Sequence, residues 1–142
     1  MIQEDYDISV IGKQSQDGES DEITLNTVGS CLRRGDTWFI AYKEYDSYQP
    51  DHPKTSVVKV EEGCVTVISK HSRLILEEGR RHLCRYDTDF GTLTMGVFTS
   101  SLHADLHEHG GKLGIKYTLE IDSSLTSYNE IHIALRRRRC AP

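Results

Sequence analysis

Three histidines and an aspartate crowd into HADLHEHGG, residues 103–111, and both residue types can bind a metal ion. If the stretch is a strand, His103, His107 and His109 share one outward face. His103 and His109 are then about 20 Å apart, at about 3.3 Å per residue. Zinc–nitrogen bonds are only about 2.0–2.1 Å long, so the three imidazoles cannot meet at one ion.

A helix would place His103 and His107 at i and i+4, a spacing that zinc enzymes use. However, Ala104 stands where such a helix needs its general-base glutamate, and the flanking sequence favours strands on both sides. We therefore predict a solvated strand face that leads into a Gly-Gly hairpin. A metal-dependent hydrolase at His103, His107 and His109 is the less favoured alternative, and no cofactor is predicted.

Other catalytic signatures are absent: the chain has no G-x-S-x-G elbow, no phosphate-binding loop and no G-x-G-x-x-G. His82 and Cys84 share one face of RHLCRY, and a cysteine nucleophile does need a base within hydrogen-bond reach. We interpret this pair as two neighbouring strand side chains. No C-x-x-C pair occurs, which predicts four free thiols in a reducing compartment, namely Cys31, Cys64, Cys84 and Cys140.

Alternation of apolar and polar residues dominates the rest of the chain. In KLGIKYTLEID, every second residue from Leu113 to Ile121 is apolar, and a helix would scatter these residues around its circumference. Similar runs are YDISV, EITLNTVGS, TWFIAYKEY, KTSVVKVEEGCVTVIS, RLILEEG, RHLCRYDT, TLTMGVFTSSL and NEIHIALR. Polar connectors rich in Gly, Asp, Ser and Pro separate them, among them residues 13–21, 46–53 and 122–129.

No segment predicts an amphipathic helix of ten residues or more. Many short strands joined by turns predict an all-β fold. We expect an antiparallel up-and-down β-barrel of about 8–10 strands, which leaves no exposed sheet edge. Residues 1–135 form this single domain, and residues 136–142 form a basic C-terminal tail.

Charge and hydropathy argue against nucleic acid and membranes as partners of this chain. The net charge is −5, and the basic run RRRR at 136–139 is too local to indicate nucleic-acid binding, which needs a basic face. No apolar run approaches the roughly 20 residues of a membrane helix. The acidic start MIQEDYDISV lacks the pattern of a signal peptide, so we expect a cytoplasmic protein. A homodimer is compatible with the sequence.

Some polar residues fall in line with apolar ones and so point into the predicted barrel. Glu44 shares a face with Trp38 and Tyr42, and a buried carboxylate needs a partner. Lys59, Arg85 or a tyrosine hydroxyl could serve. The alternative is that Glu44 lies at the barrel mouth, in water.

The chain resembles the bacterial YwiB-like family, a domain family of unknown function, from about Ile8 to Leu135. The resemblance is carried in order by DEITLNTVGS, IAYKEY, KTSVVKV, YDTDFGTLTMGVFTSSL and GGKLGIKYTLEI. It implies a lipocalin-like (calycin-type) β-barrel and no activity. The chain departs from the family pattern at SKHS, where Lys70 replaces an arginine that is closely followed by a glycine.

The leading functional hypothesis is a non-catalytic barrel that binds a small, partly apolar ligand in its interior. The alternative is an interaction protein whose barrel is filled by its own side chains and which meets a partner through its acidic half or its arginine tail. The interior ligand-binding candidates are Trp38, Tyr42, Glu44, Thr55, Lys59, Tyr86, Thr88, Thr99 and Tyr117.

Overall fold

The computed structural model describes residues 4–46, 49–70, 72–121 and 124–138, with the backbone alone described at 45–46, 49–53 and 125. These residues contain ten strands and no helix. The predicted all-β fold is confirmed, and the described chain has no helix long and apolar enough to span a membrane. The strands are β1 (Tyr6–Gln16), β2 (Glu19–Arg34), β3 (Thr37–Asp46), β4 (Gln49–Glu61), β5 (Cys64–Ile68), β6 (Arg73–Glu77), β7 (Arg81–Thr88), β8 (Gly91–His107), β9 (Gly110–Ile121) and β10 (Ser124–Arg137).

The strands form a single up-and-down barrel with an incomplete seam. Each strand pairs antiparallel with its sequence neighbours except β6 with β7, and β1 pairs with β10. Across this seam an isolated bridge joins Ser72, next to β6, to Tyr86 of β7, and a second joins Glu78, after β6, to Thr99 of β8. The Ile75 amide also lies 3.5 Å from the Cys84 sulfur. The predicted barrel is therefore confirmed, while the lipocalin likeness stays a prediction.

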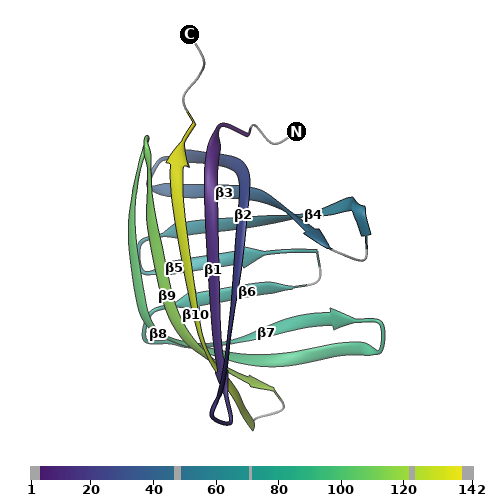
Figure 1. The fold of residues 1–142 in the computed structure, drawn as a ribbon. Helices are drawn as coiled ribbons and strands as arrows, with labels where there is room; N and C mark the ends of the chain where they lie inside the picture. Colours follow the sequence, from purple (N-terminus) through teal and green to yellow (C-terminus); the bar gives the residue numbers. More distant parts are fainter. Residues whose placement is uncertain (1–3, 47–48, 71, 122–123, 139–142) are drawn as a thin grey trace.

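The turns that connect the strands from β2 to β8 define two ends of the barrel, because strand direction alternates. The β2–β3, β4–β5 and β6–β7 turns lie together at one end, here named the turn end (Figure 1, left). The β3–β4 and β7–β8 hairpins project at the opposite end, named the arm end (Figure 1, right). Residues at opposite ends of one strand therefore belong to different surroundings.

Two long strands turn the corners between the front and back of the barrel (Figure 1). Strand β2 pairs with β1 as far as Gly29 and with β3 from Gly29 onward. A Cβ built on Gly29 would lie 2.1 Å from the Ala41 carbonyl oxygen, so only glycine fits this bend. Strand β8 is irregular between Thr99 and Ser101. These bends roll the sheet into a barrel.

Several predicted connectors are strand instead, and this part of the prediction was wrong. Residues 13–21 form the end of the β1–β2 hairpin, with a turn at Asp17 and Gly18, whose φ angles are 50° and 81°. Two positive φ angles are typical of a two-residue type I′ hairpin turn. β4 begins at Gln49, and β10 begins at Ser124. Residues 13–22 are exposed on both faces because this hairpin runs past the core, so they lack the alternation that marks a half-buried strand.

The core fills the middle of the barrel. Inward side chains from at least seven strands are at most 2% exposed. Complete burial of one such aliphatic side chain contributes about 1.5–3 kcal/mol. The fully buried aliphatic set is Ile8, Ile40, Val58, Val65, Leu76, Val97, Leu113 and Ile115.

Candidate functional site

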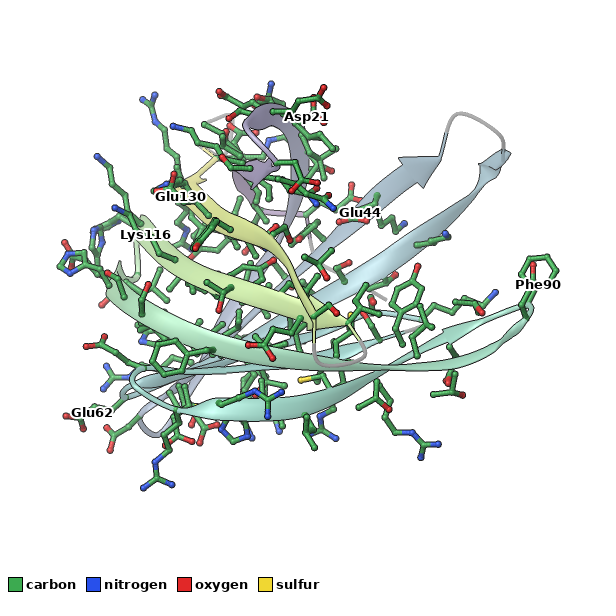
Figure 2. The ribbon with its side chains drawn as sticks, turned by 90° about the horizontal axis from the view of Figure 1, so that it is seen from below. Asp21, Glu44, Glu62, Phe90, Lys116 and Glu130 are labelled. Carbon is green, nitrogen blue, oxygen red and sulfur yellow. The ribbon has the colours of Figure 1, made fainter. Side chains whose placement is uncertain are left out.

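Strand β3 points its alternate residues into the barrel, as the sequence predicts. Ile40 and Tyr42 are buried, at 0% and 4% exposure, and Trp38 and Glu44 are partly buried. Trp38 is at the turn end, where the Arg33 guanidinium lies 5.7 Å from its ring centre. Glu44 is at the arm end, and Figure 2 shows it on the inner side of the projecting β3–β4 hairpin. One strand thus carries candidates to two separate places.

The Tyr42 phenol is the most enclosed polar group among the predicted residues of β3. It lies between Gly29 of β2 and Ser56 of β4, and Ser56 is 3% exposed. Burial and, second, the Glu44 carboxylate raise the pKa of Tyr42 to about 12, while the Ser56 hydroxyl opposes the rise. The phenol is therefore neutral at physiological pH and available as a hydrogen-bond donor.

Two interior candidates lie on the outer face, and their predicted placement was wrong. Thr55 and Lys59 alternate with the buried residues Ser56, Val58 and Val60 on β4. The Lys59 ammonium lies 3.6 Å from the Glu61 carboxylate. The run Val57-Val58 is apolar on both faces, so the sequence of this strand did not fix which face is inside.

Glu44 consequently lacks two of its three predicted partners. Lys59 is on the outer face, and Arg85 is exposed and alternates with the buried Cys84. Lys54 is the residue opposite Glu44 on β4, and Tyr42 is near enough for the Glu44 charge to raise the phenol pKa. A tyrosine is thus the predicted partner that lies nearby, and partial exposure at the arm end keeps the carboxylate hydrated.

Tyr86 and Thr88 are also at the arm end, on the same side of β7 as Cys84. Tyr86 faces Leu93 across the β7–β8 pair, and they are 39% and 38% exposed. Met95, the next inward residue on β8, is only 7% exposed. Tyr86 and Leu93 therefore form an uncovered apolar shelf beyond the core, which we call the arm shelf.

The Thr88 hydroxyl is already used by the hairpin turn. It donates to the Gly91 carbonyl at 2.7 Å and accepts from the Phe90 amide at 3.2 Å. Phe90 is fully exposed at the tip of this hairpin (Figure 2). The position of Thr88 therefore fits a turn role.

Thr99 and Tyr117 are neighbours on β8 and β9, away from the arm shelf. Thr99 is fully buried, and its hydroxyl has no hydrogen-bond partner among the described residues. It lies at the turn end, because its backbone carbonyl accepts from the Gly79 amide at 2.8 Å. Burial raises the pKa of Tyr117, so this phenol is also neutral.

The sequence interpretation missed three inward polar residues. Ser56 faces Tyr42, and Ser127 is 1% exposed. Asn129 faces Tyr117 and donates to the Ser127 hydroxyl at 2.9 Å. Ser127 and Asn129 are in line with Ile131 and Ile133, and this alternation is the signal that could have found them.

The histidines of the 103–111 stretch are on the outer face of β8 and in the following turn. His103 and His107 are exposed, and the His107 and His109 ring centres are 6.1 Å apart. Within the described ranges, no three His, Cys, Asp or Glu side chains are grouped so that they could hold a metal ion.

The thiols described are unpaired, and Cys140 lies outside the described residues. Burial raises the pKa of Cys31 to about 11 and also raises that of Cys64, which disfavours a thiolate. Cys84 is 3% exposed, while its neighbour His82 lies 2.9 Å from the Glu77 carboxylate. This geometry gives His82 a partner other than the thiol.

The first arginines of the predicted tail belong to the barrel. Arg136 and Arg137 extend β10 and pair with Asp7 and Tyr6 of β1. The Arg138 guanidinium lies 3.6 Å from the Asp7 carboxylate. Arg139 lies outside the described residues.

The fold and the candidate site define a β-barrel with neutral polar groups inside. Residues 8–133 match the Domain of unknown function (DUF1934), and the chain belongs to this family. It is 27% identical over 110 residues to the uncharacterized beta-barrel protein YwiB of Bacillus subtilis (strain 168). The aligned region covers 74% of this chain and 74% of that protein. The predicted membership in a YwiB-like family is confirmed.

A solved structure of a relative has the same fold. The crystal structure of ywiB protein from Bacillus subtilis matches with a TM-score of 0.83 and 21% identity, covering 94% of this chain and 92% of that chain. The monomer form of the M. tuberculosis PknI sensor domain matches at a TM-score of 0.44 and 12% identity, covering 100% of this chain and 91% of that chain. The latter value is too low to support an argument.

Proposed function

We propose that the protein binds a small, partly apolar molecule at the arm end of its barrel and does not catalyse a reaction. The observation that carries this proposal is the arm shelf, where Tyr86 and Leu93 are more than a third exposed although they face inward. An inward apolar surface that the chain itself leaves uncovered can be covered by an apolar ligand.

Polar groups at the same end support a mixed ligand. Glu44 would accept a hydrogen bond or attract a cationic group, and the neutral Tyr42 phenol beside it would donate one. No nucleophile with a base in reach accompanies them among the described residues, which favours binding over catalysis. Trp38 and Thr99, at the turn end, would then have structural roles.

We further propose a cytoplasmic location and no membrane or nucleic-acid partner. The unpaired thiols Cys31, Cys64 and Cys84 support a reducing compartment. The net charge of −5 argues against binding to a polyanion.

Native mass spectrometry of the protein purified from its own cells tests the proposal. We expect a bound molecule that raises the melting temperature when added back, because a ligand at 100 times its Kd stabilises by about 2.7 kcal/mol. Tyr86→Ser and Glu44→Gln should each reduce that shift. Tyr128→Ser is the matched control, since Tyr128 is 60% exposed and outside the arm shelf.

A protein that carries no small molecule, and whose melting temperature responds to none of a metabolite library, would overturn this function. The filled middle of the barrel favours one alternative, an interaction protein or a homodimer. Removal of residues 139–142 alone would test a role of the tail, because Arg136 and Arg137 pair within the barrel.

A further inference from the structure

A second feature lies on the outer face of the barrel, independent of the arm shelf. The registers of three adjacent strands place His103 of β8, Gly114 of β9 and His132 of β10 side by side. Neighbouring strands are about 4.8 Å apart, so the two histidines flank a position that has no side chain.

Two lysines complete the surroundings of Gly114. Lys112 and Lys116 lie two residues before and after it on the same face of β9, about 7 Å away along the strand. Four basic or titratable side chains therefore surround one glycine from four directions. Figure 2 shows Lys116 on the outside of the barrel, near Glu130.

The position above Gly114 is bordered on one side by the His132 imidazole and is otherwise open. A Cβ built on Gly114 would lie 3.5 Å from Nδ1 of His132, an ordinary contact distance. The surrounding groove has a volume of about 330 Å³. The lining also includes the polar residues Ser9 and Ser101 and the apolar residues Ile11 and Ala134.

All the ionisable side chains that line the groove are basic or histidine: Lys112, Lys116, His103 and His132. Two acids stand next to it without lining it. Asp105 pairs with Lys112 across the strands, and Glu130 lies 3.7 Å from the Lys116 ammonium and 3.6 Å from Nε2 of His132. Glu130 thus lies beside two of the donors, and Lys13 lies opposite it on β1.

We propose that this groove binds a small soluble organic oxyanion, a phosphate or carboxylate on a flat apolar body. The oxyanion would lie over Gly114, where ammonium and imidazole groups can donate charge-assisted hydrogen bonds. The apolar body would rest on Ile11 and Ala134. The groove volume exceeds what an oxyanion alone would fill, which is why the proposal includes the apolar body.

Isothermal titration with phenyl phosphate tests the proposal, with inorganic phosphate and phenol as the two halves of the probe. We expect phenyl phosphate to bind at least tenfold more tightly than either half. Equal binding of phenol would overturn the oxyanion role, and equal binding of inorganic phosphate would overturn the role of the apolar body. No measurable binding of phenyl phosphate would overturn the site.

Gly114→Ala provides the decisive variant, because the added methyl group occupies the oxyanion position without a clash. We expect affinity to fall at least fivefold while the melting temperature is kept. Gly12→Ala is the matched control, since a Cβ on Gly12 meets nothing within 4 Å and this glycine does not line the groove. Unchanged affinity in Gly114→Ala would overturn the proposal.

Single substitutions separate the donors from general surface charge. His103→Gln and Lys112→Met should each weaken phenyl phosphate several-fold, whereas His107→Gln, outside the groove on the same strand, should not. An equal effect of all three would overturn the site in favour of diffuse charge. Sedimentation with vesicles that contain phosphatidic acid distinguishes a lipid headgroup: we expect the protein to stay in solution, and sedimentation would overturn a soluble ligand.

Discussion

The arm shelf and the outer groove over Gly114 are built on opposite principles. At the arm end, one neutral phenol and one carboxylate, from Tyr42 and Glu44, accompany the inward-facing side chains of the arm shelf. On the outer face, exposed cations and imidazoles surround a missing side chain. The first arrangement selects for apolar shape, because apolar area removed from water drives binding. The second selects for charge, and it is sensitive to salt.

Two glycines in the barrel wall, Gly29 and Gly114, differ in a similar way. Gly29 is needed where β2 bends, because backbone of a neighbouring strand occupies the place of a side chain. The backbone around Gly114 does not require a glycine, because an added Cβ would meet only the His132 ring, at an ordinary contact distance. A glycine that weakens a strand without a structural reason is a candidate for a close approach of a ligand.

The largest expected effect comes from adding one methyl group at these two positions. Gly29→Ala should lower the free energy of unfolding by about 2 kcal/mol, since overpacking against fixed neighbours costs about 1–3 kcal/mol. Gly114→Ala should leave it unchanged or raise it by up to about 1 kcal/mol, since the unfolded chain loses freedom. Urea unfolding of both variants at one pH measures this, and equal losses would remove the contrast.

Alternation in the sequence was enough to predict the barrel. In strands such as β3 and β9 the buried residues, Ile40 and Tyr42 or Leu113 and Ile115, are spaced two apart with a less buried residue between them, so their faces could be assigned without the structure. For β4, the prediction of the inner face was wrong. Apolar Val57 and Val58 fit either face, and pairing of Ser56 with the buried Tyr42 decides which side is inside. Thr55 and Lys59 were misplaced for that reason.

The candidate sites were less predictable because they depend on register. His103 and His132 are brought to Gly114 by two hairpins whose turns set the alignment of three strands. A shift of one residue in either pairing would send one histidine inward. The separation of Trp38 from Tyr86 likewise depends on which turns share an end, which strand patterns alone do not reveal.

The ionisation of Tyr42 gives the next largest effect, at alkaline pH. The native pKa is about 12, above the ordinary tyrosine pKa of about 10. Between these values the unfolded chain loses the phenol proton and the native chain keeps it, so unfolding is favoured as pH rises. Between the two pKa values, this group lowers the free energy of unfolding by up to about 1.4 kcal/mol per pH unit. The stabilisation that the neutral Tyr42 phenol contributes is fully present below about pH 10.

Tyr42→Phe should remove that part of the pH dependence. Urea unfolding at several pH values from 9 to 11.5 would compare it with the parent chain, with Tyr128→Phe as the control because Tyr128 is exposed. An unchanged slope in Tyr42→Phe would mean that the phenol is hydrated, and the arm end would then be wetter than its burial indicates.

Thr99 offers the smallest effect and sharpens the contrast between the two ends of the barrel. Its buried hydroxyl has no partner among the described residues, and such a group destabilises the native state by about 1–3 kcal/mol. Thr99→Val keeps the shape and removes the hydroxyl, so it should raise the free energy of unfolding by about 1 kcal/mol. Chemical denaturation measures this.

The same variant decides whether a ligand reaches the turn end. If the bound molecule lies only on the arm shelf, Thr99→Val should leave its thermal shift unchanged, whereas Glu44→Gln reduces it. A ligand that extends through the barrel would instead use the Thr99 hydroxyl, and the valine variant would then bind it more weakly. That result would join the two ends into one site and would require the core between them, around Ile40 and Val97, to open on binding.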